Sequence, residues 1–92
     1  MNAVRVNIPG ALRDFTGGAA EVEVRAATVG AALAAIGETH PAFLARVLTP
    51  EGELRPHVNV FLERDSVKSL DGLATPLPQG AALTIVPAVA GG

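Results

Sequence analysis

The 92-residue chain carries seven Lys and Arg residues against nine Asp and Glu residues, which gives a formal net charge of −2. This length predicts one domain, and because the few basic residues form no stripe, nucleic-acid binding is not expected. The absence of cysteine excludes disulfides, thiolate catalysis and cysteine metal sites. With neither an apolar run of about 18 residues nor a signal-peptide pattern, we expect a cytoplasmic protein without a membrane span.

Two alternating segments, residues 3–8 and 21–26, predict a β-hairpin near the N-terminus. Gly17-Gly18 supplies the turn between them, in a connection longer than the tightest hairpin loops. Every second residue of the two segments is apolar, and these side chains are expected to point inward: Val4, Val6, Ile8, Val22 and Val24.

The main helix is predicted over residues 27–38. Thr28 is a suitable N-cap, and Gly37 fits the C′ position just beyond a helix end. Four apolar residues share one helical face through their i, i+3, i+4, i+7 spacing: Val29, Ala32, Leu33 and Ile36. We expect this face to pack on the hairpin, and a short second helical turn to follow within residues 40–52.

A third strand is predicted from the alternation in "HVNVFLERDSV", residues 57–67. Val58, Val60 and Leu62 share the inner face, so Phe61 is expected on the opposite face. A polar turn around Arg64-Asp65 and a short strand near Val67-Lys68 should follow.

The last strand is predicted over residues 81–87, with Leu83 and Ile85 inward. Pro87 ends its ladder because proline has no N–H to donate. A hairpin, a helix and further strands on one sheet make an α+β layer pair. The order is that of the ubiquitin-like β-grasp: a mixed sheet packed on one main helix, followed by a flexible C-terminal Gly-Gly tail. We therefore expect a domain over residues 1–87 and a functional tail over residues 88–92.

No group of residues resembles a self-contained active site. His40 and His57 have no carboxylate or second histidine spaced to form a metal or catalytic set, so structural or solvated roles are expected. Ser66 and Ser69 lack an adjacent base, which argues against a hydrolase triad. Gly17-Gly18 does not join a strand to a helix as phosphate-binding glycines do. We therefore expect neither a catalytic residue nor a bound metal in this chain.

The outer face of the third strand carries Phe61, and Val86 lies on the outer side of the last strand. Sheets of this kind can leave one face to solvent. The two side chains form a candidate partner surface, against the alternative that their exposure is incidental.

The tail, Ala88-Val89-Ala90-Gly91-Gly92, carries no charged side chain and spans at most about 17 Å when extended, at about 3.4 Å per residue. Such a segment can thread a narrow channel, and the two glycines allow another backbone or an ATP site to approach closely. A terminal carboxylate is a poor acyl donor until it is activated, most simply as a mixed anhydride with AMP. A sulfur source could then displace AMP and leave a thiocarboxylate.

The β-grasp order, the closing "LTIVPAVAGG" and the terminal Gly91-Gly92 resemble the ubiquitin-like sulfur carriers of the ThiS/MoaD type over essentially the whole chain. "TGG" after "LRDF", "GLAT" before the last strand and "PAVAGG" look most like the carriers of thiocarboxylate-dependent cysteine biosynthesis. The resemblance implies that Gly92 carries the sulfur. It also implies that Gly91, Ala90, Val89 and Ala88 thread into a partner's groove.

The resemblance also implies which partners and cofactors are involved. It implies an adenylating enzyme that resembles ubiquitin-activating enzymes and uses ATP. In the cysteine branch it implies a pyridoxal-phosphate-dependent synthase that takes an activated serine derivative, and a metalloprotease that releases cysteine. The cofactors would all belong to these partners, and the free carrier is expected to be a monomer.

Three alternatives remain open at this point. The chain could be a non-catalytic subunit that stays docked in an enzyme, as in molybdopterin synthase. It could be a protein modifier joined to lysines through an isopeptide bond. It could also be a plain interaction domain whose terminal glycines are accidental.

Overall fold

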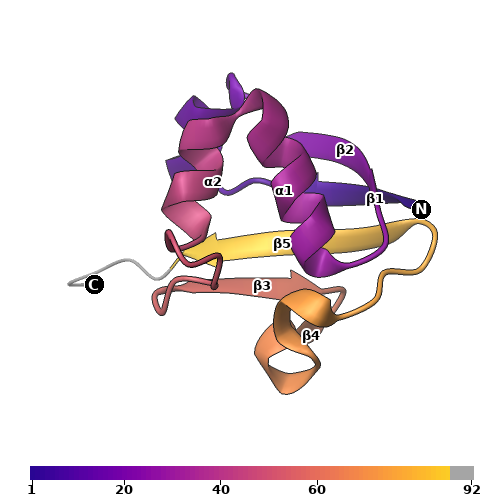
Figure 1. Cartoon of the computed structure of the whole chain (residues 1–92). Coiled ribbons are helices and arrows are strands. Elements are labelled where there is room, and N and C mark those ends of the chain that lie inside the picture. Colours follow the sequence, from indigo (N-terminus) through magenta and orange to yellow (C-terminus); the bar gives the residue numbers. More distant parts are fainter. Residues whose placement is uncertain (88–92) are drawn as a thin grey trace.

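A computed structural model describes residues 1–87; the predicted tail, residues 88–92, lies outside this range. Helices α1 and α2 lie on one face of a five-stranded mixed sheet (Figure 1). Short 3₁₀ helices (η) occupy parts of the connections. The elements in chain order are β1 (Asn2–Asn7), η1 (Gly10–Thr16), β2 (Glu21–Ala26), α1 (Val29–Thr39), α2 (Pro41–Val47), β3 (Val58–Leu62), β4 (Asp65–Ser66), η2 (Val67–Ser69), η3 (Gly72–Ala74) and β5 (Ala81–Pro87).

The sheet order is β2-β1-β5-β3-β4, which places the first and last strands side by side at its centre. β1 and β5 run parallel, whereas the β1–β2, β3–β5 and β3–β4 pairs are antiparallel. The predicted ubiquitin-like β-grasp fold, with a mixed sheet packed on a main helix, is therefore confirmed. Among the described residues, no helix is long and apolar enough to cross a membrane.

The core lies between the sheet and the two helices, and the predicted inner faces form it. Val4, Val6 and Ile8 are buried, as are Leu83 and Ile85 on β5. Val22 and Val24 on β2 are only partly buried but pack against the same cluster. The β1–β2 hairpin is confirmed, although its connection contains η1, a 3₁₀ helix that the sequence analysis did not predict.

The main helix begins where the sequence predicts. The Thr28 Oγ1 accepts a hydrogen bond from the Ala31 N–H at 3.2 Å, as expected of an N-cap. All four residues of the predicted apolar face are buried: Val29, Ala32, Leu33 and Ile36.

The predicted end of this helix at Gly37 is wrong, because α1 continues to Thr39. A Cβ built on Gly37 would lie 2.5 Å from Leu44 Cδ2 and 3.0 Å from Leu44 Cβ. The glycine therefore allows α2 to approach α1 closely, which local sequence does not reveal.

We expect Gly37→Val to lower the free energy of unfolding by about 2 kcal/mol, because its branched side chain would overlap Leu44. The matched control is Gly10→Val, since a Cβ at Gly10 meets no atom within 4 Å. A change below about 0.5 kcal/mol is expected there. Urea denaturation measures both, and equal stability of the two variants would show that α1 and α2 do not depend on this contact.

The second predicted helical turn is α2, which begins at Pro41 and buries Phe43 and Val47. Proline suits this position because the first helical N–H has no acceptor within the helix. The predicted short strand near Val67-Lys68 is wrong: β4 precedes it at Asp65–Ser66, and η2 occupies Val67–Ser69.

The reason for that difference lies in the turn after β3. Glu63 adopts φ 55° and, with Arg64, forms a turn one residue earlier than predicted. The Ser66 Oγ then accepts a hydrogen bond from the Lys68 N–H at 3.3 Å, which starts the 3₁₀ turn and ends the strand. Ser66 and Asp65 remain paired with Phe61 and Leu62.

Candidate functional site

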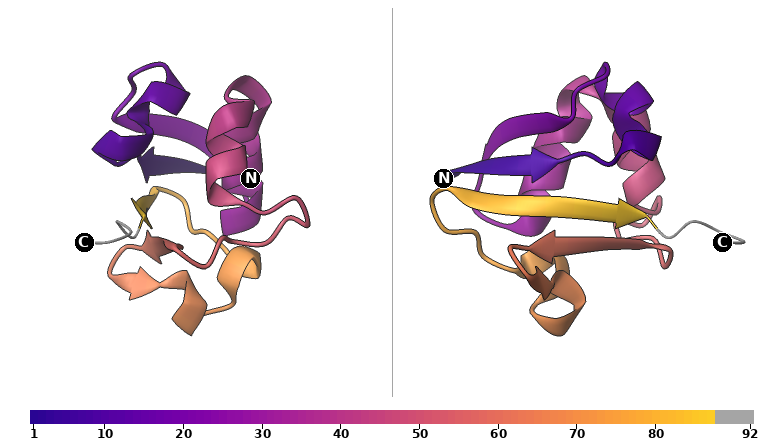
Figure 2. Two further views of the ribbon diagram at one scale, coloured as in Figure 1. Left: turned by 90° about the vertical axis from the view of Figure 1, so that its left-hand side faces the viewer. Right: turned by 180° about the vertical axis from the view of Figure 1, so that it is seen from behind.

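The candidate site surrounds Pro87, the last described residue of β5, because the predicted tail follows it in the sequence. Pro87 is paired with Val58 at the start of β3, and Thr84 is paired with Asn7 at the end of β1. The left view of Figure 2 looks at this edge of the molecule, with η1 at the upper left and with α2 and the loop before β3 to the right of the strands. The predicted sulfur-carrying and threading residues, Gly92 and Ala88–Gly91, follow Pro87 and lie outside the described residues.

Phe61 lies on the face of β3 opposite the buried Val58 and Val60, as the alternation predicts. Its side chain is half-buried rather than fully exposed, whereas Val86 is 43% exposed. Both line one groove, which we call the sheet groove. It is lined by Pro56, His57, Val58, Asn59, Phe61, Lys68 and Val86. The structure thus brings together the two predicted partner-surface residues on adjacent strands.

Asn59 organises the floor of the sheet groove. Its Oδ1 accepts a hydrogen bond from the Ser66 Oγ at 2.9 Å and one from the Val60 N–H at 2.9 Å. Through Ser66 this side chain links β3 to β4. No sequence motif marks Asn59 as a site residue, because its partner Ser66, seven residues later, comes close only when β3 and β4 pair.

A second pocket, which we call the β1 pocket, borders the other side of β5. It is lined by Asn7, Ile8, Pro9, Arg13 and residues 84–87. The Arg13 Nε donates a hydrogen bond to the Ile8 carbonyl at 3.0 Å, which holds this guanidinium beside the end of β1. Sequence reasoning missed Arg13 because it lies in the unpredicted η1.

Two of the residues considered as catalytic candidates, Ser66 and His40, have structural contacts. Ser66 engages Asn59 and the Lys68 N–H, as described above, and the backbone of His40 links the end of α1 to α2. Within residues 1–87, no group of three or more His, Asp and Glu side chains is arranged to hold a metal ion. The sheet groove and the β1 pocket thus lie on the two sides of the described end of β5.

Comparisons with known proteins agree with this arrangement. The model of the ThiS family matches residues 6–92. The chain is 36% identical to the sulfur carrier protein CysO of Mycobacterium tuberculosis over 91 residues, covering 97% of this chain and 98% of that protein. It is 41% identical to small archaeal modifier protein 3 of Haloferax volcanii over 66 residues, which cover 72% of this chain and 71% of that one.

Among solved structures, a chain of the BexX/CysO complex of Amycolatopsis orientalis superposes with a TM-score of 0.90. Its sequence identity is 38%, and the match covers 97% of this chain and 99% of that chain. The fold, the 36% identity to a sulfur carrier over nearly the full length and the family match through Gly92 all point to the same family. The chain therefore belongs to the ThiS family of ubiquitin-like sulfur carriers.

Proposed function

We propose that this protein carries sulfur as a thiocarboxylate on Gly92 for a biosynthetic pathway that makes cysteine or another sulfur-containing metabolite. The main support is the family match, which extends through Gly91-Gly92, together with nearly full-length similarity to CysO. In this proposal residues 1–87 form the folded domain, and residues 88–92 form the arm that reaches the partner's active site.

The chemistry is group transfer at the Gly92 carboxyl. A carboxylate oxygen attacks the α-phosphorus of ATP, pyrophosphate leaves, and an acyl-adenylate forms. A sulfur nucleophile at the oxidation level of hydrosulfide then attacks the acyl carbon, and AMP leaves with the electrons of the broken C–O bond. The product thiocarboxylate is nucleophilic at sulfur and is ready to react with an electrophilic acceptor.

The partners supply the catalysts and cofactors in this proposal. An adenylating enzyme related to ubiquitin-activating enzymes binds ATP. A pyridoxal-phosphate-dependent synthase receives the sulfur, and a metalloprotease releases the product. The BexX/CysO complex of Amycolatopsis orientalis supports the view that a carrier of this kind docks on an enzyme. The small carrier itself acts as a substrate of these enzymes rather than as a catalyst.

Mass spectrometry of the intact protein, purified from its native host, tests the proposal directly. The expected result is a population heavier by the mass difference between sulfur and oxygen, located by fragmentation at Gly92. A protein that shows only the carboxylate form, even after incubation with the adenylating enzyme, ATP and sulfide, would contradict it. Stable copurification with a larger subunit would instead favour the docked-subunit function.

A second candidate function is protein modification, which the similarity to small archaeal modifier protein 3 favours. The same acyl-adenylate can pass Gly92 to a lysine amine and form an isopeptide bond. Tryptic peptides that carry a C-terminal remnant of this chain on lysine would identify this function. The two functions share the activation step and differ in the nucleophile that receives the acyl group or sulfur.

We expect Phe61→Ala to weaken the complex with the adenylating enzyme by about tenfold or more, because a buried aromatic anchor contributes about 2 kcal/mol or more at an interface. The half-buried position of Phe61 on the open sheet face predicts a smaller loss of stability than for a core residue. Calorimetric titration and denaturation curves measure the two effects. A strongly destabilised monomer with unchanged affinity would contradict this role for Phe61.

A further inference from the structure

Charged residues are distributed unevenly around the end of β5. A third pocket, which we call the basic pocket, is lined by Ala45, Arg46, Arg55 and His57. Counting the sheet groove and the β1 pocket as well, the pockets at this edge are lined by four of the seven Lys and Arg residues and by none of the nine Asp and Glu residues. The four are Arg13, Arg46, Arg55 and Lys68. A protein with a net charge of −2 thus presents a locally cationic edge.

The two guanidinium groups of the basic pocket are held in place by contacts that leave donors available. The Arg55 Nε donates a hydrogen bond to the Ala45 carbonyl at 3.0 Å. The guanidinium carbon of Arg46 lies 4.6 Å from the centroid of the Phe15 ring. A guanidinium group has five N–H donors. The Arg55 contact uses one of these donors, and the Arg46 contact uses only one face of the group. Because the side chains are already positioned, less rotamer entropy is lost when they bind an anion.

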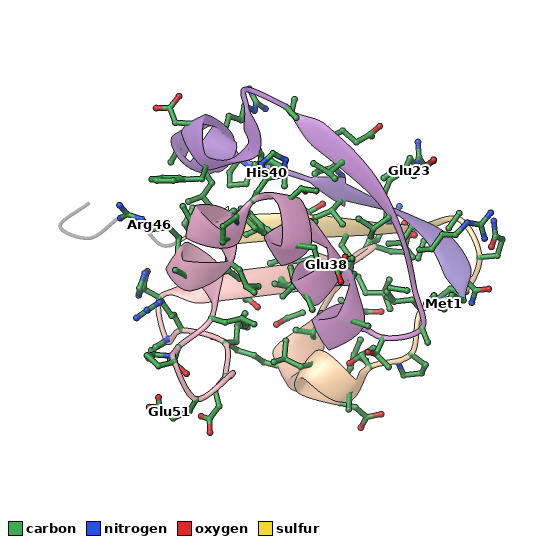
Figure 3. All side chains as sticks on the ribbon, turned by 45° about the horizontal axis from the view of Figure 1, so that its top comes forward. Met1, Glu23, Glu38, His40, Arg46 and Glu51 are labelled. Atoms are coloured by element: carbon green, nitrogen blue, oxygen red, sulfur yellow. The ribbon has the colours of Figure 1, made fainter. Side chains whose placement is uncertain are left out.

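No carboxylate of the described residues neutralises this pocket. Within residues 1–87 neither guanidinium forms an ion pair with N···O of 4.0 Å or less. The loop that carries Arg55 also contains Glu51 and Glu53, but the hydrogen bond of Arg55 goes to a backbone carbonyl. Figure 3 shows Glu51 at the loop tip, away from Arg46 on α2. No carboxylate within residues 1–87 therefore competes with a partner's carboxylate for direct pairing with these two guanidinium groups.

The basic pocket is continuous with the predicted partner surface. His57 lines both the basic pocket and the sheet groove, where Phe61 and Val86 lie. Val86 in turn lines the β1 pocket together with Arg13. Cationic side chains thus flank an apolar centre on several sides. A partner surface complementary to it would have an apolar centre surrounded by carboxylates.

We propose that the cations around the end of β5 bind Asp and Glu side chains of the adenylating enzyme and orient the carrier so that residue 88 onward enters the active site. This inference rests on the proposed function. A protein occupant is favoured over a nucleic acid because four cations on an acidic domain neutralise few phosphates. Charge pairs at such a rim act mainly on the association rate and its salt dependence.

The test compares two double variants that remove the same charge. Arg46→Gln/Arg55→Gln alters the basic pocket, whereas Arg25→Gln/Arg64→Gln removes two exposed arginines that line none of the three pockets. Affinity for the host's adenylating enzyme is measured by calorimetry at about 50 mM and about 300 mM salt. The Debye length is about 10 Å at 0.1 M salt, so attraction between exposed charges is weaker at the higher concentration. Thermal melts check folding, and Arg46→Gln alone replaces the double variant if that one unfolds.

We expect the basic-pocket variant to bind about tenfold more weakly at low salt, with a smaller loss at high salt, and the control to change by less than about twofold. Equal losses of affinity in the two double variants, or a loss that does not depend on salt, would overturn the inference. The proposed function would still stand in that case if the wild-type protein binds the enzyme. Failure of the wild-type protein to bind the enzyme would overturn both. Tighter binding of a random single-stranded oligonucleotide than of the enzyme would assign the cationic edge to nucleic acid and reject a protein occupant.

Discussion

Deletion of Gly92 is expected to abolish ATP–pyrophosphate exchange by the adenylating enzyme while leaving the melting temperature of the domain unchanged. The reacting carboxyl group would move back by one residue, about 3.4 Å of extended chain, and would no longer reach the α-phosphorus. Misplacement by about 1 Å can already reduce a rate about 100-fold. Addition of one alanine after Gly92 should have the same effect, because the carboxyl group would be displaced in the opposite direction.

We expect stability to be unaffected because the core cluster of the described residues is built within residues 1–87, before the deleted position. The control is Arg25→Gln, which changes an exposed residue of β2 that lines none of the three pockets; it should retain full exchange. Undiminished exchange in the extended variant would contradict both the role of Gly92 and the proposed carrier function.

The second large effect is expected from Gly91→Val. A branched side chain at this position obstructs the close approach of the enzyme's backbone, so activation or transfer should fall far more than stability. Val60→Ala should show the opposite pattern, a large loss of stability with little direct effect on activation, because Val60 is fully buried in the core. That truncation should cost about 2–4 kcal/mol, which lowers the melting temperature by roughly 10 °C or more in a domain of this size.

The comparison separates a functional from a structural glycine. Exchange kinetics and thermal melts are measured on both variants under the same conditions. A loss of melting temperature in Gly91→Val as large as that in Val60→Ala would show that the glycine supports the fold. Normal activation and transfer by a stable Gly91→Val protein would reject the threading role.

Elements with local signals could be predicted from the amino-acid sequence. Alternation in β1, β3 and β5 predicted which side chains are buried, because neighbouring residues in a strand point to opposite faces. The four apolar positions of α1 and its Thr28 cap followed from helical periodicity and from the hydrogen-bonding capacity of the hydroxyl. The terminal Gly91-Gly92 motif was also readable without a structure, and the family match includes it.

Features that depend on contacts between distant residues became visible only in the folded protein. Gly37 appeared to be a helix end because glycine commonly follows one, yet it lies within α1 where Leu44 leaves no room for a side chain. The parallel pairing of β1 with β5 joins residues 77 positions apart, such as Val6 and Leu83, and no local pattern specifies this neighbour. The cationic edge has the same origin. Its four cations come from η1, α2, the loop before β3 and η2, and only the fold brings the pockets that they line beside one another: Arg13, Arg46, Arg55 and Lys68.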